Sequence, residues 1–86
     1  MIKARINDKV RGFYFKSNED LEYNNDMNPF IGRIGIITDI NEISFEISFY
    51  ENDDFNKMEL DDFWYYPKSE IDKHLVQDNN ELFPIF

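Results

Sequence analysis

The sequence of 86 residues contains no cysteine, one histidine, three glycines, three prolines and no long hydrophobic run. Without cysteine the chain forms neither disulfides nor thiolate metal sites, a composition that fits a reducing cytosol. No apolar run approaches the roughly 20 residues of a membrane-spanning helix, and the charged N-terminus lacks the apolar segment of a secretory signal. We therefore expect a cytoplasmic protein, in the host cytoplasm if a phage encodes it, that does not act on membranes.

Few residues suit catalysis. With one histidine and no cysteine, the sequence offers few residues for the common nucleophile–base pairs. The histidine, His74, is expected at the surface of a short helix. Carboxylates are abundant, in the adjacent pairs Glu19-Asp20, Asp53-Asp54 and Asp61-Asp62. A catalytic carboxyl group needs a raised pKa, which adjacent aspartates in a polar loop seldom have. The stretch 53–62 has oxygen ligands for Ca²⁺, but neither the spacing nor the glycine of an EF-hand. We expect no enzyme, no cofactor and no metal site, with a metal-dependent enzyme as an alternative.

Negative charge is abundant and unevenly placed. The net charge is −9: residues 1–35 carry six Lys/Arg against five Asp/Glu, and residues 36–86 carry three against thirteen. Nucleic-acid binding normally needs a basic face, so we expect no direct binding to DNA or RNA. A host protein with a basic or nucleic-acid-binding surface is the more natural partner. The alternative is that the acidity only keeps a small domain soluble.

Four segments have the pattern of β-strands. Ile43–Tyr50 alternates strictly between apolar and polar residues, which is typical of a half-buried antiparallel strand. Lys9–Phe15 and Phe30–Ile40 are rich in aromatic or β-branched residues and predict two earlier strands. The aromatic run Phe63–Tyr66 predicts a fourth strand, which Pro67 would stop.

The segments between these strands are polar. Lys16–Pro29 predicts a long first loop, with anchors at Leu21, Tyr23 and Met27. Asn41-Glu42 predicts a two-residue turn, and Glu51–Asp62 predicts an acidic loop.

The end of the chain predicts one short helix and a tail. Ser69 would cap a helix over Glu70–Val76, with Asp72 completing a capping box and with Ile71 and Leu75 facing the core. The following residues, 77–86, end in the apolar sequence Leu82-Phe83-Pro84-Ile85-Phe86. Apolar side chains exposed together are a liability, so we expect the tail to pack on its own domain or on a second copy in a homodimer.

Together these elements predict one mainly β domain over residues 1–86, with its core at 9–76: a small antiparallel barrel of about 4–5 strands. The order of five short motifs resembles that of SH3-like small barrels, particularly short uncharacterised bacteriophage proteins. The motifs are Val10-Arg11-Gly12-Phe13, Met27-Asn28-Pro29-Phe30-Ile31-Gly32, Gly35-Ile36-Ile37, Ile43-Ser44-Phe45 and Trp64-Tyr65-Tyr66-Pro67. The resemblance implies an SH3-like fold and a phage or mobile-element origin, but no activity. Glu51–Asp62 is longer than the pattern, which indicates a specialisation of this chain.

Two neighbouring segments are candidates for the binding surface. In a strand, Trp64 and Tyr66 would share one face, and Phe63 and Tyr65 the other. One pair would be core and the other would anchor a partner, unless both pairs pack. The acidic loop is either a solvated loop or a surface that imitates spaced phosphates. The predicted partner-binding residues are Asp53, Asp54, Phe55, Glu59, Asp61, Asp62, Trp64 and Tyr65.

The leading hypothesis is a phage-encoded acidic module that binds and inhibits or modulates a host protein, such as a nucleic-acid-handling or defence enzyme, by imitating DNA. The alternative is a structural or accessory module that self-associates through its C-terminal tail.

Overall fold

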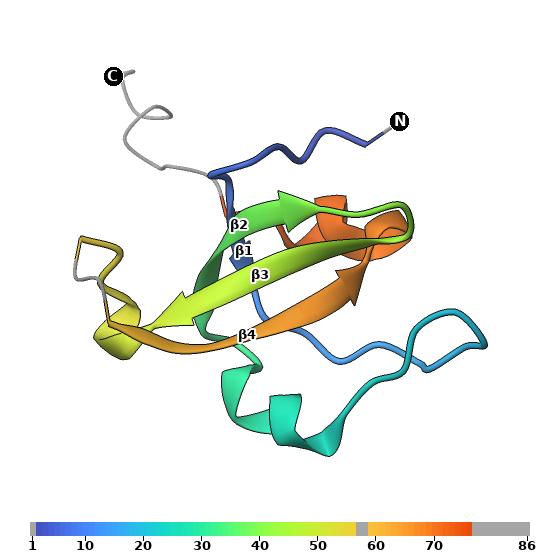
Figure 1. The fold of residues 1–86 in the computed structure, drawn as a ribbon, viewed down its shortest axis with the longest axis horizontal. Helices are drawn as coiled ribbons and strands as arrows, with labels where there is room; N and C mark the ends of the chain where they lie inside the picture. Colours follow the sequence, from blue (N-terminus) through green and yellow to red (C-terminus); the bar gives the residue numbers. More distant parts are fainter. Residues whose placement is uncertain (1, 57–58, 77–86) are drawn as a thin grey trace, which may run out of the picture.

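The computed structural model describes residues 2–56 and 59–76, so the predicted tail at 77–86 lies outside the described residues (Figure 1). The described part is mainly β, with four strands and three 3₁₀ helices. In chain order these are β1 (Lys9–Arg11), η1 (Asn25–Phe30), β2 (Ile34–Ile40), β3 (Ser44–Tyr50), η2 (Glu51–Asp53), β4 (Leu60–Pro67) and η3 (Lys68–His74). The strands form one open antiparallel sheet in the order β1-β2-β3-β4. A mainly β fold with a long first connection is therefore confirmed.

Strand β3 follows the alternation that the sequence predicts. Phe45, Ile47 and Phe49 are at most 1% exposed and point into the core, whereas Glu46 lies on the opposite face. Each apolar residue of β3 has a partner on β4, and the pairs Phe45–Tyr66 and Ile47–Trp64 lie on the core face. This pairing decides which face of the aromatic run 63–66 is buried.

The turn before β3 lies one residue later than predicted. The Asn41 N–H donates to the Ser44 C=O at 2.7 Å, which makes Glu42 and Ile43 the two central residues. Ile43 is consequently exposed and not part of the strand. The prediction of a turn at Asn41-Glu42 was wrong by one position because Asn41 belongs to the hydrogen-bonded end of the hairpin.

Strand β1 ends at Arg11, four residues before the predicted end at Phe15. Beyond it, the Gly12 N–H donates to the Arg33 C=O at 2.8 Å, and the Gly12 C=O accepts from the Gly32 N–H at 2.9 Å. Gly12 approaches the returning loop so closely that a Cβ atom there would lie 2.2 Å from the Phe30 carbonyl oxygen. Close backbone approach, which favours glycine, thus replaces strand pairing.

The predicted strand Phe30–Ile40 begins only at Ile34, because its first part belongs to η1 and the bend after it. Asn24 caps η1 through its side chain, which accepts from the Asp26 N–H at 2.8 Å. The helix buries Met27 and Phe30, and Leu21 and Tyr23 pack against the same core from the preceding loop. The three predicted anchors of the long loop are therefore confirmed.

Helix η3 starts directly after Pro67 and has no side-chain cap, so the predicted capping box at Ser69 and Asp72 was wrong. The Asp72 carboxylate instead accepts from the N–H groups of Lys3 and Ala4, at 2.9 and 3.0 Å. Ile71 is fully buried, as predicted.

The chain after η3 runs back beside β1. Leu75 packs against the core and forms an isolated antiparallel bridge with Val10. Next to it, the Val76 N–H donates to the Lys9 C=O at 2.9 Å. The last described residues therefore lie on the side of β1 away from β2.

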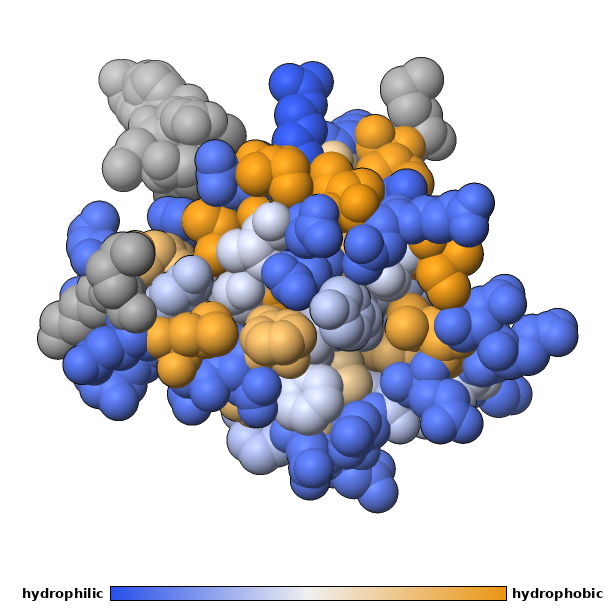
Figure 2. Space-filling model, viewed as in Figure 1, coloured by the Kyte–Doolittle hydropathy of each residue, from blue (hydrophilic) through white to orange (hydrophobic). Residues whose placement is uncertain are grey.

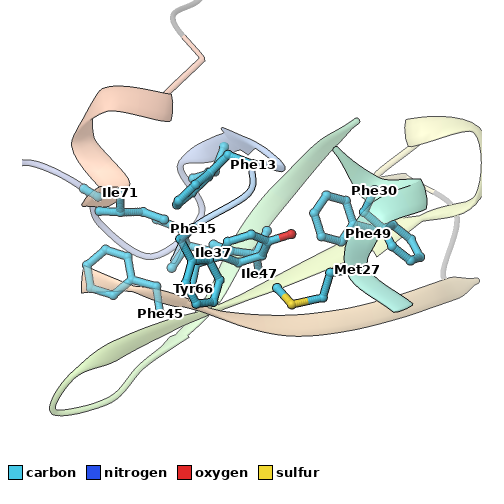
Figure 3. Packing of buried hydrophobic residues seen from close by; sticks show 12 residues of the cluster. Phe13, Phe15, Met27, Phe30, Ile37, Phe45, Ile47, Phe49, Tyr66 and Ile71 are labelled. Atoms are coloured by element: carbon cyan, nitrogen blue, oxygen red, sulfur yellow. The ribbon is translucent and has the colours of Figure 1, made fainter. Parts of the chain in front are cut away.

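The core lies between the sheet on one side and the long loop with η1 and η3 on the other. Figure 3 shows ten labelled members: Phe13, Phe15, Met27, Phe30, Ile37, Phe45, Ile47, Phe49, Tyr66 and Ile71. Aromatic rings dominate it, with Phe13–Tyr66 and Phe30–Phe49 centroids each 4.9 Å apart. Burial raises the pKa of Tyr66 well above its usual range, so its hydroxyl stays neutral. Large rings let a short chain fill its core with few side chains.

Candidate protein-binding surface

Two aromatic rings are exposed on the face of the sheet opposite the core. Phe63 is 43% exposed and Tyr65 is 41% exposed, and their ring centroids lie 6.1 Å apart in an edge-to-face arrangement. The sheet register places them opposite Ser48 and Glu46 of β3. Figure 2 shows that apolar side chains are scattered over this view of the molecule, with hydrophilic ones between and around them. Exposed rings next to each other are the usual anchors of protein interfaces.

Carboxylates border these rings. Glu46 accepts a hydrogen bond from the Thr38 hydroxyl at 2.7 Å and another from the Tyr65 hydroxyl at 3.2 Å. Asp39 lies directly opposite Glu46 across the β2–β3 pair. Partial burial, together with the charges of Glu46 and Asp39, raises the pKa of Tyr65 and so favours the protonated, donating form of its hydroxyl.

Asp39 and Glu46 have no cationic partner within residues 2–56 and 59–76. Both salt bridges of the described residues are made by Arg33, on the side of the acidic loop. Like charges directly opposite each other in a sheet are unfavourable, so this pair gains from an external cation. A Lys or Arg side chain from a partner would meet carboxylates and aromatic rings at the same place.

Arg33 organises the acidic loop, which the sequence did not indicate. Its Nε and terminal nitrogens donate to Asp53 at 3.2 Å, to Asp61 at 2.8 Å and to the Tyr50 C=O at 2.9 Å. The guanidinium also lies 5.0 Å from the centroid of the Phe30 ring. The hydrogen bond to Asp61 is the largest of the effects that raise the pKa of Arg33. Two of the predicted acidic contact residues are therefore already paired within the chain.

The loop after β3 is folded rather than extended. Asn52 and Asp53 have φ angles of 58° and 56°, in the left-handed region. Phe55 is half-buried between the Tyr50 ring, at 6.0 Å, and the Lys9 ammonium, at 5.6 Å. Between this loop and the sheet lies an open cleft of about 700 Å³, lined by Lys9, Ile34, Ile36 and residues 52–56. Phe55 thus helps to hold the loop against the sheet.

The predicted site residues separate into three groups. Tyr65 lies on the exposed face, whereas Trp64 points to the core side, where its ring lies 6.3 Å from Phe30. Asp53 and Phe55, in the segment after β3, and Asp61, at the start of β4, make the contacts with Arg33, Tyr50 and Lys9 described above. The remaining residues, Asp54, Glu59 and Asp62, are exposed or half-buried, and Asp62 accepts from the Phe63 N–H at 2.8 Å. The acidic stretch does not form one loop, because residues 60–62 belong to β4.

Sequence reasoning left four residues out of the site: Phe63, Glu46, Asp39 and Arg33. Phe63 follows from strand alternation once Tyr66 is known to face the core. The pairing of Glu46 with Asp39 depends on a register shift in β2, and the contacts of Arg33 join residues 20 and 28 positions apart. The spacing of residues along the sequence indicates neither the Glu46–Asp39 pairing nor the contacts of Arg33.

His74 lies in the last turn of η3, as expected, but its imidazole is half-buried rather than fully exposed. It stacks on the Phe13 ring with centroids 3.7 Å apart, and burial lowers its pKa. In the part of the chain that the structure describes, no three His, Asp or Glu side chains are grouped to hold a metal ion. Within the same part, no helix has the length and apolar character needed to cross a membrane.

Comparison of the chain with protein-family models, curated proteins and solved structures finds no match in any of the three. The candidate surface is therefore defined by its own geometry and chemistry.

Proposed function

We propose that this protein is a small SH3-like module that binds a basic protein surface through the outer face of its sheet. The observation that carries the proposal is the pair of exposed rings, Phe63 and Tyr65, beside the carboxylates of Glu46 and Asp39. A cation held over an aromatic ring contributes about 0.5–2 kcal/mol, depending on how well it is desolvated. Burial of the two rings adds apolar area at the same place.

Charge supports the same class of partner. The net charge of −9 favours fast encounter with a basic protein and disfavours nucleic acid and anionic lipid. Because Arg33 pairs with Asp53 and Asp61, imitation of phosphates would depend on the other carboxylates. For a phage protein, the target would be a host protein with a nucleic-acid-binding surface, which the module would block or modulate.

The path of the chain supports the SH3-like part of the proposal. A long first loop, a three-stranded meander and a 3₁₀ helix follow each other in the order that the resemblance implies. The bridge from Leu75 to Val10 then brings the end of the described chain next to β1, as closure of a small barrel would require.

Affinity capture from lysates of candidate bacterial hosts, followed by mass spectrometry, tests the function. We expect the wild-type protein to retain a basic partner that is released by salt. The double variant Phe63→Ser/Tyr65→Ser should lose it, because both anchors are removed. The control is Tyr14→Ser, since Tyr14 is 63% exposed but lies outside the sheet, in the connection between β1 and η1. Equal retention by wild type and double variant, or no salt-sensitive partner at all, would contradict the proposal.

A further inference from the structure

The free edge of β4 has unpaired backbone groups at the candidate surface. β4 is the outer strand of the sheet and pairs with β3 alone (Figure 1). In an antiparallel pair, alternate residues direct their N–H and C=O groups toward the neighbouring strand. The Lys68 N–H donates to the Ile43 C=O at 3.0 Å in continuation of the β3–β4 register, which fixes this alternation. By the same alternation, Phe63 and Tyr65 direct their backbone groups away from β3.

Two features close part of this edge and leave a short open stretch. The Asp62 carboxylate accepts from the Phe63 N–H at 2.8 Å, and Pro67 has no N–H to offer. By this alternation three neighbouring groups point away from β3, and none of them makes a backbone hydrogen bond outside the strand ladder within the described residues: the Phe63 C=O, the Tyr65 N–H and the Tyr65 C=O. An added antiparallel strand would exchange two hydrogen bonds with Tyr65 and donate a third to Phe63. Within this stretch Trp64 and Tyr66 direct their backbone groups to β3, so an added strand would take its register from Tyr65.

The side chains around the open stretch favour a basic occupant. A residue paired with Tyr65 or Phe63 would place its side chain over the outer face, beside these rings and the carboxylate of Glu46. The Asp62 carboxylate lies at the same edge, and Glu59 immediately precedes β4. A second copy of the chain would bring further carboxylates to this edge, whereas Lys or Arg side chains would neutralise those present.

We propose that the β4 edge takes up an extended basic segment of a partner protein as an additional antiparallel strand, in the register set by Tyr65. The proposal rests on the proposed function and adds the way in which the partner binds. Main-chain hydrogen bonds then provide affinity, and the alternating side chains provide specificity.

The test uses the full chain, labelled with ¹⁵N, and a blocked heptapeptide of alternating Lys and Val. Paired in the predicted register, the peptide's Lys residues lie over the outer face and donate their N–H groups to β4, while the Val N–H groups point away. N-methylation of the Val residues should therefore leave binding unchanged, and N-methylation of the Lys residues should abolish it. At saturation, exchange of the Tyr65 amide hydrogen should slow by about tenfold or more, while that of Phe63 stays unchanged.

Three other results would overturn the proposal. Equal binding of both methylated peptides without protection of the Tyr65 amide would mean that the outer face binds and the edge does not, and the proposed function would stand. Concentration-dependent protection of Tyr65 without peptide would identify a second copy as the occupant. Failure of every peptide to bind would reject a basic strand at this edge, and the proposed function would fall only if the capture from lysate failed as well.

Discussion

The guanidinium group of Arg33 contacts Asp53 in η2, Asp61 in β4, the backbone of Tyr50 and the ring of Phe30. These contacts join both ends of the acidic loop to the loop that precedes β2. The Arg33 side chain is 28% exposed, so its charge-assisted hydrogen bonds are partly shielded from water. No feature of the sequence marks this arginine, because its partners are adjacent only in the folded chain.

Replacement of Arg33 by alanine should lower the free energy of unfolding by about 1–3 kcal/mol, since several charge-assisted bonds are lost from a partly exposed site. Arg33→Lys should recover only part of this loss, because an ammonium group does not reproduce the planar donor geometry of guanidinium. Urea denaturation gives both values.

Arg5→Ala is the matched control, since Arg5 is exposed and its side chain makes no hydrogen bond within the described residues. If Arg33→Ala were no less stable than Arg5→Ala, the contacts of Arg33 would be without consequence for the fold. If Arg33→Lys were as stable as the wild type, the positive charge alone would account for the stabilisation, and the planar donor geometry of guanidinium would not be needed.

At the scale of the elements, the sequence predicts the interior of the sheet better than its ends. Strand β3 is predictable because its alternation is strict and one face is fully buried. The end of β1 and the start of β2 are not, because both depend on Gly12 meeting the loop around Ile31 and Gly32. This contact joins segments about 20 residues apart in the sequence, so no local sequence pattern predicts it.

The candidate site shows the same division. Alternation within Phe63–Tyr66 predicts that one pair of rings is exposed, and the burial of Tyr66 decides which pair it is. The carboxylates that border the rings come from β2 and β3, so their proximity follows from strand register and not from spacing. Prediction from the acidic stretch alone placed too much weight on residues 53 and 61.

Gly12→Ala should destabilise the fold by about 1–3 kcal/mol through overpacking. The new Cβ would lie 2.2 Å from the Phe30 carbonyl oxygen and 3.3 Å from the Phe49 ring. The backbone at Gly12 cannot move away cheaply, because its N–H and C=O are both hydrogen-bonded. Thermal unfolding followed by circular dichroism measures the loss.

Substitution of Gly32 should also destabilise the fold, but through backbone strain and not through a steric clash. Its φ angle is 89° and no atom lies within 4 Å of the position that a Cβ would take, so substitution there costs backbone strain without a clash. Gly32→Asn should therefore be tolerated better than Gly32→Ala, because Asn accepts positive φ more readily. At Gly12 the alanine variant should be the more stable of the two, since Asn is larger and would clash more. A Gly12→Ala variant as stable as the wild type would contradict the close approach of Gly12 to the Phe30 carbonyl.

For the whole molecule, the balance of charge is the property that most affects both stability and binding. A net charge of −9 on 86 residues leaves the folded chain under self-repulsion. The salt bridges within the described residues both belong to Arg33 and offset only a small part of it. Raising NaCl from 0.01 M to 1 M shortens the screening length from about 30 Å to about 3 Å. Repulsion is spread over the surface, whereas the Arg33 contacts are short and partly buried, so salt weakens the repulsion more.

We therefore expect the midpoint of thermal unfolding to rise with NaCl, by about 4–8 °C for each kcal/mol of repulsion that is screened. The variant Asp20→Asn/Glu22→Gln removes two exposed charges in the long loop. At low salt it should unfold at a higher temperature than the wild type, and it should gain less from added salt. A midpoint that falls with salt would mean that attraction around Arg33 outweighs the repulsion. In that case the acidic surface would be balanced within the chain, and a basic partner would gain little by neutralising it.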